Sequence, residues 1–432
     1  MLDTPTLGEN PVVFDWQWTL SATPEQLWPL VSDTNRMNVL AAMAPATFTE
    51  IPIEDGGSAR TGQTKQLGLG VTWDEHPFEW VYPQGFSVLR EFHNGVLACY
   101  RSSVLLLPQA EGTRLIHRVE LIPRLGIMRP FVEREGVKQQ KSWEHAYRAV
   151  DAYLTAGGPW PFGGRRKVKS NGPSRETEAE IERESPSPEL ELRLFRHVLT
   201  EHDHELTHVR PFLLADRWRE DRRAMLEAFQ YATSRKWLKA QWSLLCPHCR
   251  GAKGTSDRLS DLPGTVHCNS CNIHFSHQAD AAVELSFTPE PRYRQVQEAT
   301  YCVGGPGSTP HIYFQAKLHD LAGKAVGLTL PPGSYRVRGP RIAGTYDFTY
   351  HGGEAAPEGQ HEEGPEVFLD REGFQGEVAH FDGPKLRMRL INKSQEPLDV
   401  VIESRDWRED VLSLAFLKEH PEWLAAFQGS GA

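Results

Sequence analysis

Several features of membrane, secreted or nucleic-acid-binding proteins are scarce in this sequence. No apolar run approaches the roughly 18 residues that a membrane-spanning helix needs. The first residues, Met1–Thr6, lack the basic and apolar regions of a signal peptide, which predicts no leader. Only six cysteines occur among 432 residues, too few for a disulfide framework. We therefore expect a soluble cytoplasmic protein.

An excess of positive charge is also absent. The 47 Lys and Arg residues stand against 57 Asp and Glu residues, for a formal net charge of −10. This balance argues against broad attraction to nucleic acid or to anionic membranes. No internal repeat is found. An apolar content of 39% and 12 tryptophans supply ample core material, and the length fits about three domains of roughly 150 residues.

Four of the six cysteines form two tight pairs, Cys246–Cys249 and Cys268–Cys271. Residues 250–267 separate the pairs, which is the spacing of a zinc ribbon. We expect two knuckles that aim four thiolates at one Zn²⁺, with Gly251 supplying backbone freedom to the first knuckle. Two separate redox sites are the alternative, and neither pair follows the βαβ pattern typical of them. A shell of four thiolates leaves no open coordination position, so the zinc is predicted to be structural.

Residues 1–156 are predicted to form one α+β domain. After a first strand, Thr23 and Gln26 have the spacing of a capping box at the start of a short helix. Segments rich in β-branched and aromatic residues then predict an antiparallel meander up to Ile122. Apolar periodicity predicts a closing helix from about Phe131 to Leu154. Together these elements make a helix-grip arrangement.

This order of elements, with the opening motif Thr23–Asp33, resembles the START/polyketide-cyclase (SRPBCC) superfamily. In that superfamily a curved sheet wraps a long C-terminal helix around an apolar cavity, so the resemblance implies a small apolar ligand. A one-residue slip of a strand would turn each candidate side chain outward, and a filled core is the alternative. The candidate ligand-binding residues are Trp73, Trp80, Phe86, Arg90, Phe92, Tyr100 and His117.

The rest of the chain is predicted to hold smaller modules. Residues 157–188, rich in glycine and charge, are expected to be a disordered linker. The sequence pattern of residues 189–245 is typical of a winged-helix-like segment. Ten Lys and Arg against eight Asp and Glu within residues 191–240 give a balance of +2, which argues against a DNA reader. The remaining predicted modules are a zinc ribbon at 246–280, an antiparallel β-sandwich at 281–405 and a C-terminal helical tail at 406–432.

Six short stretches stand out in the segment from the ribbon into the sandwich: Cys246–Arg250, Leu262–Pro263, Val266–Ile273, Val283–Phe287, Tyr301–Pro306 and Thr309–His311. With these stretches, the segment resembles the uncharacterised region that precedes the catalytic domain of many bacterial class III adenylate and guanylate cyclases. We recognise no segment with the metal-binding aspartate pair and the transition-state Arg and Asn of those cyclases. We therefore do not predict cyclase activity for this chain. The resemblance implies a sensory or regulatory role, with a nucleotidyl cyclase or another signalling protein as partner.

We therefore expect a non-enzymatic regulatory protein that binds a small apolar ligand and relays its presence through a zinc-stabilised module. Two alternatives stay open. One is a polyketide-cyclase-type enzyme in which His117 and Glu120 form an acid/base pair. The other is a ligand-responsive regulator that binds DNA. The glycine-rich stretch 302–311 lacks the Lys-Ser/Thr of a phosphate loop, and we expect a tight loop with Gly304 and Gly305 at special backbone angles.

Overall fold

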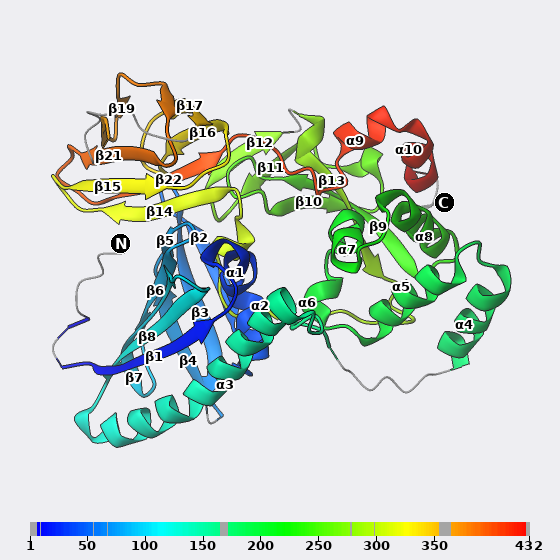
Figure 1. Cartoon of the computed structure of the whole chain (residues 1–432), viewed down its shortest axis with the longest axis horizontal. Coiled ribbons are helices and arrows are strands. Elements are labelled where there is room, and N and C mark those ends of the chain that lie inside the picture. Colours follow the sequence, from blue (N-terminus) through cyan, green and yellow to red (C-terminus); the bar gives the residue numbers. More distant parts are fainter. Residues whose placement is uncertain are drawn as a thin grey trace. The chain divides into compact units, whose positions relative to one another are not determined.

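The structure is a computed structural model that describes residues 7–8, 10–54, 56–66, 68–164, 172–276, 279–297, 299–353 and 364–428 (Figure 1). The chain divides into two compact units. The first holds Met1–Pro161, Asn269–Asn272 and Thr300–Asp406, and the second holds Phe162–Cys268, Ile273–Ala299 and Trp407–Ala432. Within the described ranges, none of the helices combines the length and apolarity needed to cross a bilayer.

The first unit begins with the helix-grip domain that the sequence predicts. The antiparallel sheet runs in the order β1-β8-β7-β6, and from β6 it continues both to β4, β3 and β2 and to β5. The helix α3 lies along β1 and β8, as Figure 1 shows. The elements are β1 (Val12–Leu20), α1 (Pro24–Val31), α2 (Thr34–Leu40), β2 (Thr47–Pro52), β3 (Ser58–Gln66), β4 (Leu69–Glu75), β5 (Glu79–Val81), β6 (Gly85–Phe92), β7 (Leu97–Pro108), β8 (Thr113–Pro123), the 3-10 turn η1 (Gly126–Met128) and α3 (Arg129–Ala156).

Local signals explain where the two main helices of this domain begin and what they bury. At the start of α1, the backbone N–H of Gln26 donates to Oγ1 of Thr23, and the N–H of Thr23 donates to Oε1 of Gln26. The predicted capping box is therefore confirmed. The helix α3 buries Val132, Gly136, Trp143, Ala146, Tyr147 and Val150 on the face that meets the sheet. Gly136 is needed there because a Cβ atom would lie 2.2 Å from Phe14.

The sheet does not end with the helix-grip domain. In β5, Val81 pairs with Phe314 of β14, and the order continues through β14-β22-β16-β17-β20 to make 13 strands in all. Backbone pairing therefore runs without a break between residues that the sequence assigns to two separate domains. The added strands are β14 (Ile312–Leu318), β16 (Gly333–Arg338), β17 (Tyr346–Gly352), β20 (His380–Asp382) and β22 (Leu398–Ser404).

A second, four-stranded sheet of the first unit has the order β15-β21-β18-β19. One buried core joins its Leu328 and Met388 to Phe314 and Val337 of the long sheet. Alternation of buried residues with half-buried or exposed ones along β14 and β21 fits a sheet with one face on that core. The strands are β15 (Gly323–Leu328), β18 (Glu366–Asp370), β19 (Gly373–Gln375) and β21 (Leu386–Asn392), and the 3-10 turn η4 (Pro306–Ser308) precedes them.

The second unit combines helices with a three-stranded sheet of order β10-β9-β13. Its helices are α4 (Gly172–Glu184), α5 (Pro188–Thr200), α6 (Asp203–Leu206), α7 (Pro211–Trp218), α8 (Arg222–Ser234), α9 (Leu414–Glu419) and α10 (Pro421–Gln428). Its strands are β9 (Leu238–Leu245), β10 (Ala252–Ser256), β11 (Thr265–Cys268), β12 (Ile273–Ser276) and β13 (Val283–Pro289), with the 3-10 turns η2 (Leu259–Asp261) and η3 (Asp280–Ala282).

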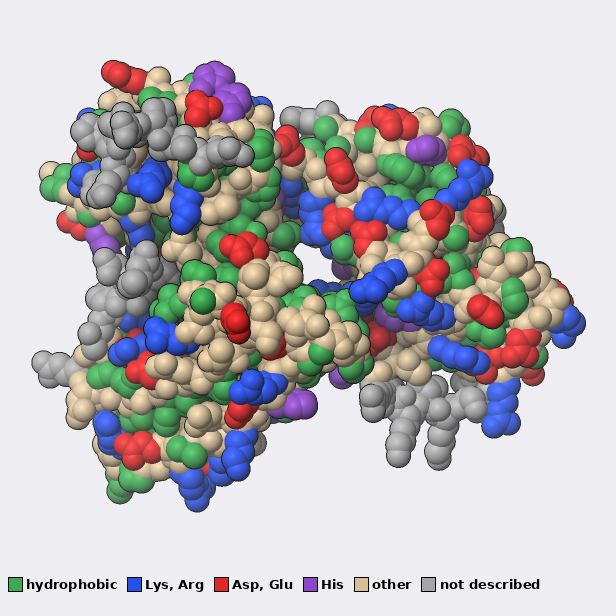
Figure 2. Space-filling model, viewed as in Figure 1, with side chains coloured by type: hydrophobic (Ala, Val, Ile, Leu, Met, Phe, Trp, Pro, Cys, Tyr) green, Lys and Arg blue, Asp and Glu red, His purple; other side chains and the backbone are tan. Residues whose placement is uncertain are grey.

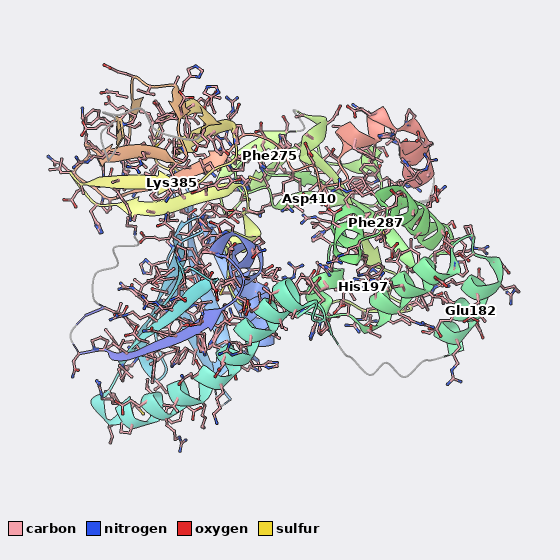
Figure 3. All side chains as sticks on the ribbon, in the orientation of Figure 1. Glu182, His197, Phe275, Phe287, Lys385 and Asp410 are labelled. Carbon is pink, nitrogen blue, oxygen red and sulfur yellow. The ribbon has the colours of Figure 1, made fainter. Side chains whose placement is uncertain are left out.

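Two boundaries differ from the prediction. β13, taken as the first sandwich strand, pairs with β9 instead, and its Phe287 (Figure 3) packs 4.7 Å from Phe229 and 5.3 Å from Phe427 between ring centroids. The predicted disordered linker contains α4, which buries Ile181 and hydrogen-bonds Thr177 to Tyr293 at 2.8 Å. Both segments fold because partners far along the chain cover their apolar side chains. The winged-helix and sandwich assignments stay predictions.

Candidate functional site

The two cysteine pairs come together in one cluster. The Sγ atoms of Cys246, Cys249, Cys268 and Cys271 all lie within 4.8 Å of one another, and Cys249 Sγ lies 3.8 Å from Cys268 Sγ. Four sulfur atoms at tetrahedral positions about 2.3 Å from Zn²⁺ are about 3.8 Å apart, so the geometry fits that ion. Cys246 and Cys268 are buried and the other two are half-buried. The four thiolates can hold a metal ion, and structural zinc fits them best.

The backbone of each knuckle turns at the residue after its second cysteine. Arg250 has φ 53° and Asn272 has φ 51°, both in the left-handed region. In the first knuckle, the N–H of Arg250 donates to the carbonyl of Cys246 at 2.8 Å. The prediction that Gly251 supplies the required freedom is wrong, because the left-handed turn falls one residue earlier. Asparagine tolerates this conformation well, and Arg250 is kept in it by the hydrogen bond of its own turn.

A second candidate site is a cavity inside the helix-grip domain. It encloses about 40 Å³ between the sheet, α2, α3 and a later loop. A water needs roughly 10–15 Å³ of such space, so this volume accommodates roughly three or four waters. Ligand pockets of drug-sized molecules are far larger, about 300–1,000 Å³. In this conformation the domain is therefore nearly filled, and a ligand of that size needs side chains or the loop to move.

The predicted ligand residues divide into two groups. Four of them line the cavity: Phe86, Arg90, Tyr100 and His117. The other three, Trp73, Trp80 and Phe92, do not. Trp73 pairs across the sheet with Phe92, and the indole of Trp80 donates to the carbonyl of Ile312 at 3.0 Å, toward β14. All three lie on the same face of the sheet as Phe86 and Arg90, because Trp80 pairs with Phe86 and Phe92 follows Arg90 by two residues on β6. Strand alternation therefore does not separate the two groups, and the sequence does not show how far along that face the cavity extends.

A chain of hydrogen-bonding groups centres on His117. Its Nε2 lies 2.9 Å from Oγ of Ser102, and its Nδ1 lies 3.2 Å from the hydroxyl of Tyr147. The ring also meets Trp143 edge-on at 4.8 Å between centroids. Burial lowers the pKa of His117 to about 3, so the imidazole is neutral at physiological pH. Ser102, Trp143 and Tyr147 line the cavity but were not among the predicted ligand contacts.

One ion pair stands at the cavity wall. The guanidinium of Arg90 donates to both oxygens of the Glu75 carboxylate, at 2.7 Å and 3.1 Å. Burial alone would lower the pKa of Arg90, but the Glu75 charge raises it above its ordinary value. Trp73 also donates its indole N–H to Glu75 at 2.7 Å, which fixes the carboxylate. Because the charges of the pair cancel and His117 is neutral, the cavity presents no net charge to a ligand.

The predicted acid/base pair is not brought together. His117 faces the cavity, whereas Glu120, three residues along the same strand, faces the opposite side of the sheet. There the carboxylate of Glu120 lies 3.5 Å from Arg101 and 3.8 Å from Arg118. Glu120 is therefore a buried partner of two arginines on the far face.

A loop from the later part of the first unit closes the cavity. Cys302 is buried and lines it, with its Sγ 3.2 Å from Nη2 of Arg90. The side chain of Asn35 clamps the loop, accepting from the N–H groups of Tyr301 and Cys302 and donating to the carbonyl of Cys302 at 3.1 Å. Burial raises the pKa of the Cys302 thiol to about 11, so it stays protonated. No local pattern in the sequence marks this cysteine, since its partners lie more than 200 residues away.

The glycines of this loop allow it to approach α1 and α2 closely. A Cβ atom on Gly307 would lie 2.5 Å from the Cα atom of Asp33, and one on Gly305 would lie 2.9 Å from the Thr34 hydroxyl. The N–H of Gly307 donates to the carbonyl of Ser32 at 3.1 Å. Gly304 has φ 71°, as predicted, but Gly305 has φ −72°, which any residue can adopt. Gly305 is therefore needed for close packing and not for an unusual backbone angle.

Comparisons with known proteins found one family and several solved structures that match parts of the chain. Residues 175–302 match a family of unknown function, DUF5939. No curated protein matches the sequence. A START superfamily protein from Mycobacterium smegmatis is 12% identical, covering 33% of this chain and 99% of its own, with a TM-score of 0.26.

Two further solved structures each match about a third of the chain. The Zhui aromatase/cyclase from Streptomyces sp. R1128 is 12% identical, covering 35% of this chain and 100% of its own, with a TM-score of 0.28. The protein TTHA0849 from Thermus thermophilus is 17% identical, covering 34% of this chain and 100% of its own, with a TM-score of 0.25. Values this low carry no argument about a ligand. The START-like assignment depends on the order and pairing of the elements themselves.

Proposed function

We propose that this protein is a non-enzymatic sensor whose START-like domain binds a small, uncharged, largely apolar molecule. The observation that carries the proposal is the loop Thr300–His311, which lies over the cavity and places Cys302 in its wall. The cavity of about 40 Å³ then represents the closed state. A ligand of ordinary size fits only when the loop moves, so occupancy and loop position are linked.

The character of the ligand follows from the lining. Phe86, Val88 and Trp143 supply apolar surface, while Ser102, His117 and Tyr147 offer neutral hydrogen bonds at one end. The only charges nearby belong, among the described lining and its partners, to the mutually neutralised Arg90 and Glu75. A charged ligand would lose its hydration without gaining a counter-ion. An apolar molecule with a hydroxyl or carbonyl group fits these groups best.

The relay is proposed to pass through the same loop. The chain enters the first unit at Thr300, directly after Ala299 of the second unit, so movement of the loop acts on the segment that joins the two. The second unit holds most of the DUF5939 match and three of the four clustered cysteines. The proposed output partner is a nucleotidyl cyclase or another signalling protein, and this part of the proposal depends on the sequence resemblance alone.

Neither alternative has a specific observation in its favour. A cavity enzyme needs an acid/base pair, and His117 and Glu120 face opposite sides of the sheet. A DNA reader needs free cations, whereas helix arginines of the second unit pair with carboxylates. These pairs include Arg193–Glu220, Arg196–Glu178, Arg217–Glu205, Arg223–Glu227 and Arg235–Glu184.

Native mass spectrometry of protein purified from cells tests the proposal. We expect the wild-type chain to carry a small molecule that is released unchanged on denaturation. Val88→Phe places a larger ring in the cavity wall and is expected to remove that mass. Val326→Phe, at an equally buried valine in the core between the two sheets, is the matched control and is expected to retain it. Wild-type protein without a bound molecule, or one chemically altered during incubation, would contradict the sensor.

A further inference from the structure

An exposed apolar stretch lies between β8 and the first turns of α3. Leu125 is 58% exposed, Ile127 83%, Met128 36%, Phe131 37% and Val137 60%. Ten large apolar side chains are exposed among the described residues, and these five fall within 13 consecutive positions. Single exposed apolar side chains are normal on a soluble protein, but a cluster of them marks an interaction surface.

This stretch is also basic, in contrast to the rest of the chain. Residues 124–141 contain five Lys and Arg and two Glu, a balance of +3 within a chain of net charge −10. The cations extend along one side of α3. Phe131, Arg134, Lys138 and Lys141 recur at intervals of three, four and three, which places them on one exposed helix face. Figure 2 shows hydrophobic side chains beside Lys and Arg side chains where α3 begins.

We propose that the surface formed by residues 125–141 docks on an anionic lipid bilayer. The short η1 turn exposes Ile127 and Met128, and both are positioned to enter the interface between headgroups and acyl chains. Arg134 and Lys138 share one carboxylate, that of Glu135, at 3.6 Å and 2.7 Å, and keep 68% and 61% of their side chains exposed. The two cations exceed this single counter-ion by one charge and lie at the depth of anionic headgroups. Apolar insertion combined with basic flanks is the recognition chemistry of a membrane surface.

The opposite face of α3 supports this assignment. Its Val132, Trp143 and Tyr147 are buried against the sheet, so the helix is anchored and its outward face is free to carry the basic residues. None of the residues 125–141 lines the cavity. Docking therefore goes beyond the proposed sensor function and can be measured independently of ligand occupancy.

Sedimentation of the full-length protein with vesicles tests the proposal. We expect binding to phosphatidylcholine vesicles that contain phosphatidylglycerol, and weaker binding when salt is raised from about 0.1 M to about 1 M. Ile127→Asp is expected to lower the partition coefficient by about tenfold or more. Leu321→Asp, at a 70%-exposed leucine outside the stretch, is the matched control and is expected to bind like wild type.

Charge and cavity variants complete the test. Lys141→Gln is expected to weaken binding by about fivefold on the anionic vesicles and to leave pure phosphatidylcholine unaffected. Val88→Phe is expected to bind vesicles like wild type even where it loses the cavity ligand. The docking proposal is overturned if the wild-type protein does not bind anionic vesicles, or if Leu321→Asp weakens binding as much as Ile127→Asp. It is also overturned if light scattering shows a dimer that Ile127→Asp dissociates, because a second copy would then cover the surface.

Discussion

The four-cysteine cluster and the START-like cavity position their side chains by different means. Each cysteine pair spans four residues, and a tight local turn directs its two thiolates. The cavity instead collects side chains from β6, β7, β8 and α3, and a loop more than 200 residues from α2 completes its wall. The direction of each cysteine side chain is thus set by residues close to it in sequence. The wall of the cavity is completed by hydrogen bonds between residues far apart in sequence.

This difference sets what each site responds to. Four thiolates close together repel one another once ionised, so the cluster is stable only with a bound cation. The cavity loop is held by hydrogen bonds of Asn35 and by close packing of Gly305 and Gly307. Such contacts are each modest in free energy and reversible, as the proposed sensor requires. We therefore expect the cluster to behave as a fixed support and the loop as the moving part.

The largest expected effect is the loss of metal from the cluster. Structural zinc contributes about 10–16 kcal/mol in small zinc modules, so Cys268→Ser is expected to lose the ion. Amide hydrogen exchange is then expected to accelerate in residues 246–276. Metal analysis by mass spectrometry should give one zinc per wild-type chain.

Cys99→Ser is the control, because Cys99 is a half-buried cysteine on β7 outside the cluster. It should retain the metal. Full zinc occupancy in Cys268→Ser would contradict the prediction. So would hydrogen exchange in β6–β8 that this variant accelerates as much as in residues 246–276, because the cavity would then not be stable independently of the cysteine cluster.

The next effect concerns the loop. Gly307→Ala places a Cβ atom 2.5 Å from the Asp33 backbone, which cannot yield as a flexible side chain would. Overpacking of this kind costs about 1–3 kcal/mol, so the open state should become about fivefold to a hundredfold more populated. The measurement is the rate at which a small alkylating reagent labels Cys302, followed by peptide mass spectrometry.

Gly327→Ala is the matched control, since a Cβ atom there meets nothing within 4 Å. It should leave Cys302 as slow to react as in wild type. An unchanged labelling rate in Gly307→Ala would mean that the loop does not open at this contact, and the comparison between a fixed cluster and a mobile loop would fail.

The same contrast explains what the sequence could and could not predict. The cysteine spacing specified the cluster, and the Thr23 capping box with the apolar periodicity of α3 specified the helix-grip domain. Phe86, Arg90, Tyr100 and His117 line the cavity, on the inward face of β6, β7 and β8, and their contact with a ligand stays a prediction. Cys302 was missed because only the folded chain brings it to Arg90. The pairing of β13 with β9 was missed for the same reason, because strand propensity does not indicate which other strand a segment pairs with.

The smallest effect is a pH dependence confined to the cavity domain. In the unfolded chain His117 takes up a proton below about pH 6.5, whereas the folded domain keeps its pKa at about 3. The unfolded state thus binds more protons in this window, and the free energy of unfolding falls as pH drops from about 6.5 toward 3. Between about pH 7.5 and about pH 5 the loss is about 2 kcal/mol, measurable from amide exchange in β7 and β8.

His117→Gln removes the titrating ring and is expected to reduce this pH-dependent loss by about 2 kcal/mol. His319→Gln, at an exposed histidine between β14 and β15, should keep the wild-type dependence. Protonation of the cysteine cluster also destabilises the protein in acid, but that contribution is common to all three proteins and cancels in the comparison. If His117→Gln loses stability between these pH values as steeply as wild type, His117 is not buried in a neutral form, and the cavity is open to water.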